Sequence, residues 1–182
     1  MTRWLFVTLG ASIFSVLDGG WLASWLSFVP SKIFHGQVWR LVTWPLIEAS
    51  PLQIVLTCLA IYKFGGELAV RWGDRRLRRF VLQIAIVAAA ITLVLAALTG
   101  AMYMRRVGGW AVINVLVITW ARQFPNAPLV LHGMVALSGQ QLINVTIGTT
   151  ILFALFTGPI WMALDLVACF AAALYPRGWL RR

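Results

Sequence analysis

Three polar side chains at the start of a long apolar stretch have residue types and spacing that suggest a built site. Glu48, Gln53 and Thr57 are spaced five and then four residues apart. Gln53 and Thr57 are one helical turn apart, so they share one face of a helix. A polar face on a membrane helix turns inward, toward other helices or a water-filled cavity. The spacing therefore predicts a polar site inside the fold.

Other residues able to do chemistry give weaker signals. His132 and Ser138 could form a serine-protease dyad, but they precede an apolar segment at its expected cytoplasmic end, far from this stretch. His35 lies in a polar loop, where we expect a solvated side chain and no metal ligand. Cys58 and Cys169 fall in apolar segments and are expected to be small buried hydrophobes. We therefore expect no metal and no cofactor, while haem ligation by His35 or His132 stays an alternative.

The composition places these residues in a membrane protein. The chain has 182 residues, 61% of them hydrophobic, and only five are acidic. Its apolar runs are too long and too many for a soluble domain. The net charge of +10 could indicate nucleic-acid binding, but the basic residues stand between apolar runs, as in cytoplasmic loops. We therefore expect no nucleic-acid partner, and one domain covering residues 1–182.

The apolar segments predict an all-α bundle of six transmembrane helices. The expected helices cover residues 4–28, 51–71, 80–100, 107–121, 141–157 and 160–175. No small-x-small cleavage site ends the first segment, so we expect a retained helix and no signal peptide. Within that helix Asp18 marks either a kink or a position near the bilayer edge. Lys63 and Glu67 are four residues apart and are expected to pair, and residues 71–79 are expected to form a basic cytoplasmic loop.

Lysines and arginines are distributed unevenly between alternate loops. With the N-terminus inside, ten lie on the inner side: Arg3, Arg71, Arg75, Arg76, Arg78, Arg79, Arg122, Arg177, Arg181 and Arg182. Four lie on the outer side: Lys32, Arg40, Arg105 and Arg106. Because cytoplasmic loops carry the excess of basic residues, both termini are expected in the cytoplasm. For a bacterial protein this multi-pass chain would lie in the inner membrane.

Residues 36–73 resemble the rhomboid superfamily of membrane proteins. The matching residues are the Trp39-Arg40 pair of the first loop, Gly65-Gly66 and Gly73. Where the family carries two histidines and an asparagine, this chain carries Glu48, Gln53 and Thr57. The resemblance implies the six-helix rhomboid core, a partly embedded first loop, and close helix packing at Gly65 and Gly66.

The resemblance also implies where a catalytic dyad would stand. Active rhomboids have a Gly-x-Ser-Gly motif at the start of helix 4 and a histidine in helix 6, which takes the proton of the serine. Here the first motif reads Gly108-Gly109-Trp110-Ala111, so an indole stands at the nucleophile position. The histidine position holds Asp165. The two glycines that follow it in the family become Ala168 and Ala172, which are small enough for close helix packing.

Two expectations follow for this degenerate site. Trp110 should fill the former catalytic cavity. Asp165 should accept the indole N–H or join the polar residues Glu48, Gln53 and Thr57 in a closed network; a solvated Asp165 in a residual cavity is equally open.

The retained Trp39-Arg40 pair and the lost dyad look like the inactive rhomboid and Derlin branches. That likeness implies a pseudoprotease that binds transmembrane segments of client proteins, with Trp39, Arg40, Gly108 and Gly109 at the binding region. The alternatives are a structural subunit of a larger membrane complex and, less favoured, a protease with a displaced site. The expected partners are the lipid bilayer and the transmembrane helices of other proteins.

Overall fold

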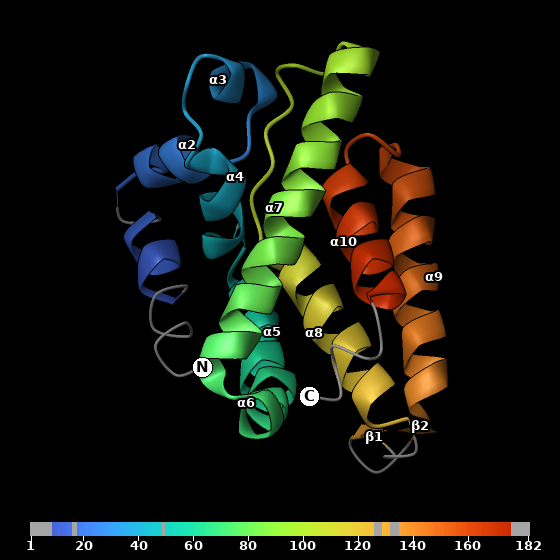
Figure 1. Ribbon diagram of the computed structural model, residues 1–182. Coiled ribbons are helices and arrows are strands. Elements are labelled where there is room, and N and C mark those ends of the chain that lie inside the picture. Colours follow the sequence, from blue (N-terminus) through green and yellow to red (C-terminus); the bar gives the residue numbers. More distant parts are fainter. Residues whose placement is uncertain (1–8, 16–17, 49, 126–128, 132–134, 176–182) are drawn as a thin grey trace.

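The computed structural model describes residues 9–15, 18–48, 50–125, 129–131 and 135–175, which form a bundle of helices with one short β-hairpin (Figure 1). After a helical stretch at residues 9–15, the elements are α2 (Trp21–Leu26), α3 (Pro30–Phe34), α4 (Arg40–Thr43), η1 (Trp44–Leu46), α5 (Pro51–Ala60), η2 (Ile61–Gly65), α6 (Gly66–Trp72), α7 (Asp74–Thr99), α8 (Trp110–Gln123), β1 (Leu129–Leu131), β2 (Val135–Leu137), α9 (Gly139–Thr157) and α10 (Ala163–Leu174). The two strands pair antiparallel, with Val130 opposite Ala136.

Three helical stretches in the described part of the chain are long and apolar enough to cross a membrane. They are Pro51–Trp72, Asp74–Thr99 and Gly139–Thr157. The helix α10 is apolar but shorter, and α8 has only 14 residues. The helical membrane-protein class expected from the sequence is confirmed, and the count of six spans stays a prediction.

The first segment is not one continuous helix, so the predicted helix over residues 4–28 is wrong. The chain turns at Asp18, Gly19 and Gly20, and the two glycines have φ values of 68° and 85°. These positive values suit glycine, which has no Cβ to clash. The Asp18 carboxylate accepts a hydrogen bond of 2.7 Å from the N–H of Leu22 in α2. Asp18 therefore marks a break, which was one of the two readings of its position.

The second segment is helical over Pro51–Trp72, close to the predicted range of residues 51–71. Ser50 caps α5 by accepting a hydrogen bond from the N–H of Gln53, and Pro51 fills the first turn. A π-helical turn, η2, joins α5 to α6 and contains Lys63, which pairs with Glu67 at 3.2 Å as their spacing predicts. A Cβ built on Gly66 meets nothing within 4 Å, so close approach of a neighbour does not require glycine there.

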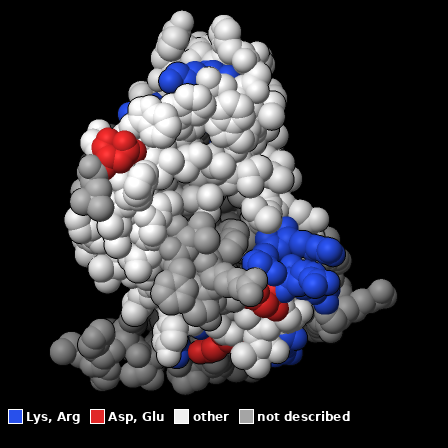
Figure 2. All heavy atoms as spheres, turned by 90° about the vertical axis from the view of Figure 1, so that its left-hand side faces the viewer, with Lys and Arg blue, Asp and Glu red and all other residues white. Residues whose placement is uncertain are grey.

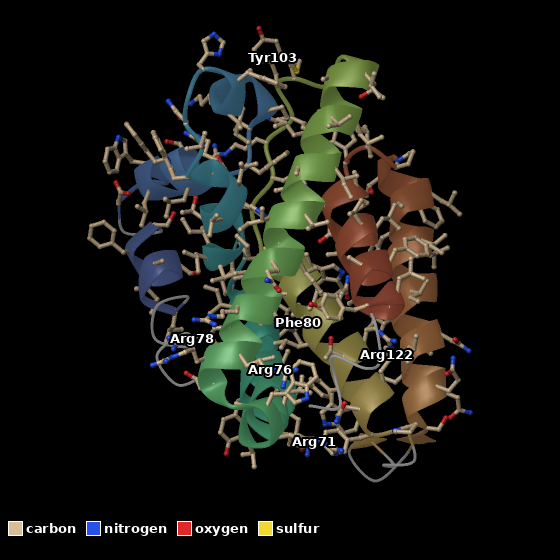
Figure 3. All side chains as sticks on the ribbon, in the orientation of Figure 1. Arg71, Arg76, Arg78, Phe80, Tyr103 and Arg122 are labelled. Carbon is tan, nitrogen blue, oxygen red and sulfur yellow. The ribbon has the colours of Figure 1, made fainter. Side chains whose placement is uncertain are left out.

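The basic run at residues 71–79 is mostly helix, and its prediction as a loop is wrong. Gly73 alone makes the turn, with φ 82°, and α7 begins at Asp74. Asp74 suits the positive end of the helix and pairs with Arg78 at 3.4 Å, one turn later. Figure 3 shows the labelled Arg71, Arg76 and Arg78 at the lower end of the bundle and Tyr103 at the opposite end.

The core is built around α8, whose residues from Asn114 to Ala121 are all buried. The helices α5, α9 and α10 all pack against it, and α7 packs against α8 and α10. On α10, Ala168 and Ala172 are each 1% exposed and belong to this core. Short side chains at these two positions let α10 lie close to its neighbours. The N-terminal end of α8 is thereby held at one fixed place between α5, α9 and α10.

Candidate functional site

A cavity of about 430 Å³ lies at the N-terminal end of α8. Its wall includes Gln53 from α5, Gly108 and Trp110 at the start of α8, Phe153 from α9, Asp165 from α10, and Arg106 from the loop before α8. Gln53, Gly108, Trp110 and Asp165 are four of the site residues expected from the sequence. Arg106 and Phe153 were not among the expected site residues; Arg106 lies just before the predicted Gly108–Trp110 stretch, and Phe153 is brought to the cavity by the packing of α9 against α8.

The side chain of Glu48 lies against the N-terminal end of α8, beside this cavity. Its Oε1 accepts hydrogen bonds from the Thr57 hydroxyl at 2.6 Å and from the Gly109 N–H at 2.8 Å. Gly109 is the N-cap residue of α8, so the carboxyl group lies at the positive end of the helix dipole. Burial raises the pKa of Glu48, and the hydrogen bonds from Thr57 and Gly109 oppose that rise. Two of the three polar residues expected to form a site, Glu48 and Thr57, are thus in contact, and Gly109 is a third partner.

The two glycines before α8 let the chain approach Glu48. A Cβ on Gly109 would lie 2.5 Å from Glu48 Oε1, closer than real Cβ atoms approach, and 3.0 Å from Thr57 Cγ2, which is a tight contact. Gly108 has φ 119°, a conformation that side chains with a Cβ rarely adopt. Both glycines are buried. Gly108 lies on the cavity wall, whereas the Gly109 N–H is already used by Glu48 and is not offered to a ligand.

Asp165 forms a buried ion pair with Arg106, at 2.6 Å between Oδ2 and Nη2. The Asp165 side chain is 3% exposed and that of Arg106 is 27% exposed. Arg106 is fixed by two backbone hydrogen bonds with Phe28, of 2.8 and 3.0 Å. The Asp165 partner is therefore neither the indole nor the Glu48 group expected from the sequence. A buried carboxylate needs a nearby cation, and this requirement could have predicted a basic partner for Asp165.

Trp110 lines the cavity but does not fill it, so the expectation of an aromatic plug is wrong. The side chain is half-buried and its ring meets that of Phe153 edge-on, with 6.5 Å between centroids. The open volume of about 430 Å³ remains beside both rings. Gln53 also faces this volume, and its side-chain oxygen accepts a hydrogen bond of 3.3 Å from the Ser50 hydroxyl. The cavity thus has an aromatic wall, an amide and an ion pair.

Arg40 has a different place from the binding surface expected for it. It is 1% exposed. Its Nη1 donates to the carbonyl oxygens of Ser24 at 2.8 Å and Ser27 at 2.6 Å, and its Nε donates to Gln37 at 2.7 Å. Arg40 therefore braces the first loop against the end of α2. The neighbouring Trp39 is 40% exposed and stacks on Trp25, so Trp39 is the member of the pair that faces outward.

The structure places two of the remaining candidates, Ser138 and His35. The Ser138 hydroxyl caps α9 by accepting a hydrogen bond from the Gln141 N–H. His132 lies outside the described residues. His35 is exposed, and its Nδ1 lies 2.6 Å from the Ser31 carbonyl oxygen. Within the described ranges, no group of three or more histidine, cysteine or acidic residues is arranged to hold a metal ion.

Comparison with known proteins supplies the family of the chain. A search of curated proteins found no match. The family described as "Eukaryotic integral membrane protein (DUF1751)" matches residues 2–179. This range includes every residue of the cavity wall and all the helices described above. Because the match spans almost the whole chain, the protein belongs to this family of integral membrane proteins.

Proposed function

We propose that the chain is a rhomboid-like membrane protein without protease activity, which binds transmembrane segments of partner proteins at the cavity beside α8. The observation that carries the proposal is the position of this cavity between α5 and α9. Both helices pack against α8 and both contribute to the cavity wall, through Gln53 and Phe153. Such a cavity offers a partner helix room for one large side chain and polar groups for a hydrogen bond.

The outer faces of the two flanking helices support a membrane-embedded partner. On α5, Val55 and Leu59 are each 62% exposed, and on α9 Phe153 is 52% and Phe156 is 82% exposed. Apolar surface of this kind contacts lipid or another transmembrane helix. Because helices in lipid associate through packing and interhelical hydrogen bonds, the apolar faces and the polar cavity together suit a transmembrane segment with a polar or aromatic residue.

The chemistry of the site argues against proteolysis. Trp110 and Asp165 stand at the positions that the rhomboid resemblance assigns to the nucleophile and its base. The Asp165 carboxylate is committed to Arg106. At the start of α8, the Gly109 N–H donates to the carboxyl group of Glu48. This backbone donor is therefore already used and is not available to stabilise an oxyanion. An ionised Glu48 would repel a second negative charge there.

We expect no labelling of the protein by an activity-based serine probe under conditions that label an active rhomboid. A serine nucleophile needs a base within hydrogen-bonding reach, and the Ser138 hydroxyl is instead the cap of α9. The measurement is gel fluorescence after probe treatment of wild-type protein and of the Ser138→Ala variant. Labelling of the wild type that disappears in Ser138→Ala would establish a displaced active site and overturn this part of the proposal.

The proposed topology has six spans with both termini in the cytoplasm, because basic residues favour the cytoplasmic side. The wall residue Arg106 would then lie toward the outer side, and the first turns of α7 toward the cytoplasm. Reporter fusions after Arg79 should report the cytoplasm, and fusions after Arg105 should report the outside. The opposite pattern would reverse the orientation while leaving the cavity unchanged.

A matched pair of variants tests binding at the cavity. Phe153 and Leu152 are neighbours on α9 with similar exposure, 52% and 53%, but only Phe153 lines the cavity. We expect Phe153→Ala to lower the recovery of co-purified membrane proteins from mild detergent several-fold, and Leu152→Ala to leave it unchanged. Equal recovery with both variants would remove the cavity from the binding site. A single partner in fixed stoichiometry would favour the alternative, a structural subunit of a complex.

A further inference from the structure

The lower end of the bundle carries a basic groove that the proposed function does not use. The groove has a volume of about 510 Å³ and is lined by Trp72, Gly73, Arg75, Arg76, Arg79 and Gln83. A patch of lysine and arginine side chains is visible on the face shown in Figure 2. Arg75 and Arg79 are exposed, and within the described residues neither forms an ion pair. Three arginines, Arg75, Arg76 and Arg79, therefore line one hollow, and two of them, Arg75 and Arg79, are exposed.

The groove lies where lipid headgroups are found. The helix α7 has 26 residues, which corresponds to a length of about 39 Å, whereas the hydrocarbon core of a bilayer is about 30 Å thick. Since α7 is apolar from Phe80 onward, its basic first turns extend beyond the hydrocarbon. The arginines of the groove are thus placed at the level of the phosphates.

An exposed apolar stripe continues from the groove along the same face of α7. At 3.6 residues per turn, Arg79 and Gln83 are followed on this face by Ile86, Ala90 and Val94, all of them exposed. Ile86 is 41% exposed and Val94 is 58% exposed. One helix face therefore offers guanidinium groups at its lower end and an apolar track beyond them. This order of surfaces matches a phospholipid, whose phosphate is followed by its acyl chains.

We propose that this groove is a binding site for an anionic phospholipid, whose phosphate contacts Arg75, Arg76 and Arg79 and whose acyl chain lies along α7. The guanidinium group presents paired N–H donors that match phosphate oxygens. A zwitterionic lipid carries the same phosphate together with a positive headgroup, which the arginines repel. The site therefore selects for net negative charge on the lipid.

The test measures lipid retained by the purified protein from membranes that contain equal amounts of phosphatidylglycerol and phosphatidylcholine, by native mass spectrometry. We expect the wild type to retain phosphatidylglycerol preferentially. Arg75→Gln and Arg79→Gln should each lower that preference about fivefold. Lys32→Gln also removes one exposed positive charge, but Lys32 lies in α3, away from the groove, so this variant should retain the preference.

Two further arms make the result decisive. The double variant with Arg75→Lys and Arg79→Lys keeps the charge but loses the paired donors, and it should retain less phosphatidylglycerol than the wild type. Soluble glycerol phosphate should not displace the lipid, because it cannot occupy the apolar track. Equal retention of both lipids by the wild type, or equal losses in Arg79→Gln and Lys32→Gln, would overturn the proposal. Displacement by glycerol phosphate would show an anion site without a lipid.

Discussion

Replacing Arg40 by alanine is expected to destabilise the protein by about 3–5 kcal/mol. The buried guanidinium donates to two carbonyl oxygens, of Ser24 and Ser27, and to the Gln37 side chain. Alanine removes these charge-assisted bonds and leaves a cavity between α2 and α4. The measurement is the free energy of unfolding in detergent micelles titrated with a denaturing detergent, followed by tryptophan fluorescence.

Two variants distinguish the hydrogen bonds of Arg40 from its positive charge as the source of stability. Arg40→Lys keeps the charge but has no fork of donors, so it should recover only part of the lost stability. Lys32→Ala removes an exposed charge from the same loop region and should change stability by less than about 0.5 kcal/mol. If Arg40→Ala unfolds at the same denaturant concentration as the wild type, the hydrogen bonds of Arg40 do not hold the loop.

Gly109→Ala is expected to cost about 2–4 kcal/mol, because its Cβ would lie 2.5 Å from Glu48 Oε1. The backbone at Gly109 has φ −81°, which alanine adopts without strain, so the expected cost comes from displacing Glu48 and its two hydrogen bonds. The same denaturation measurement applies. This prediction follows from the contact between the loop before α8 and Glu48, which organises the site.

A glycine on α9 supplies the matched control. A Cβ on Gly148 meets nothing within 4 Å, so Gly148→Ala should be neutral or stabilising by up to about 1 kcal/mol, through helix propensity. In a Glu48→Ala background the Gly109→Ala change should cost much less than in the wild type, since its clashing group is gone. A cost that is independent of Glu48 would contradict the contact.

The local sequence predicted those parts of the fold that are decided within one helix. The helix predicted over residues 51–71 and the Lys63–Glu67 pair are both found, because each is decided by local spacing. The arginines after Gly73 are expected from the sequence to form a cytoplasmic loop, because basic clusters between apolar segments mark such loops, but they are helical. Arginine is a good helix former, and a single glycine at φ 82° makes the turn, so α7 begins six residues earlier than expected.

The site was predicted where its residues lie near each other in the chain. Glu48 and Thr57 are close in sequence and in space. Arg106 pairs with Asp165 across 59 positions, and this pair depends on how α10 packs beside the loop before α8. The open cavity beside Trp110 depends on where Phe153 of α9 lies. Neither contact leaves a periodic pattern in the sequence, so residue spacing alone does not predict them.

Photo-crosslinking from α9 tests the central proposal most directly. A photoreactive phenylalanine analogue is placed at position 153, on the cavity wall, or at position 152, which points in another direction on the same helix. The account predicts that position 153 captures a membrane-embedded peptide of a partner protein several-fold more than position 152 does, as identified by mass spectrometry. Equal capture at both positions, or capture of only soluble segments, would contradict a cavity that receives transmembrane helices.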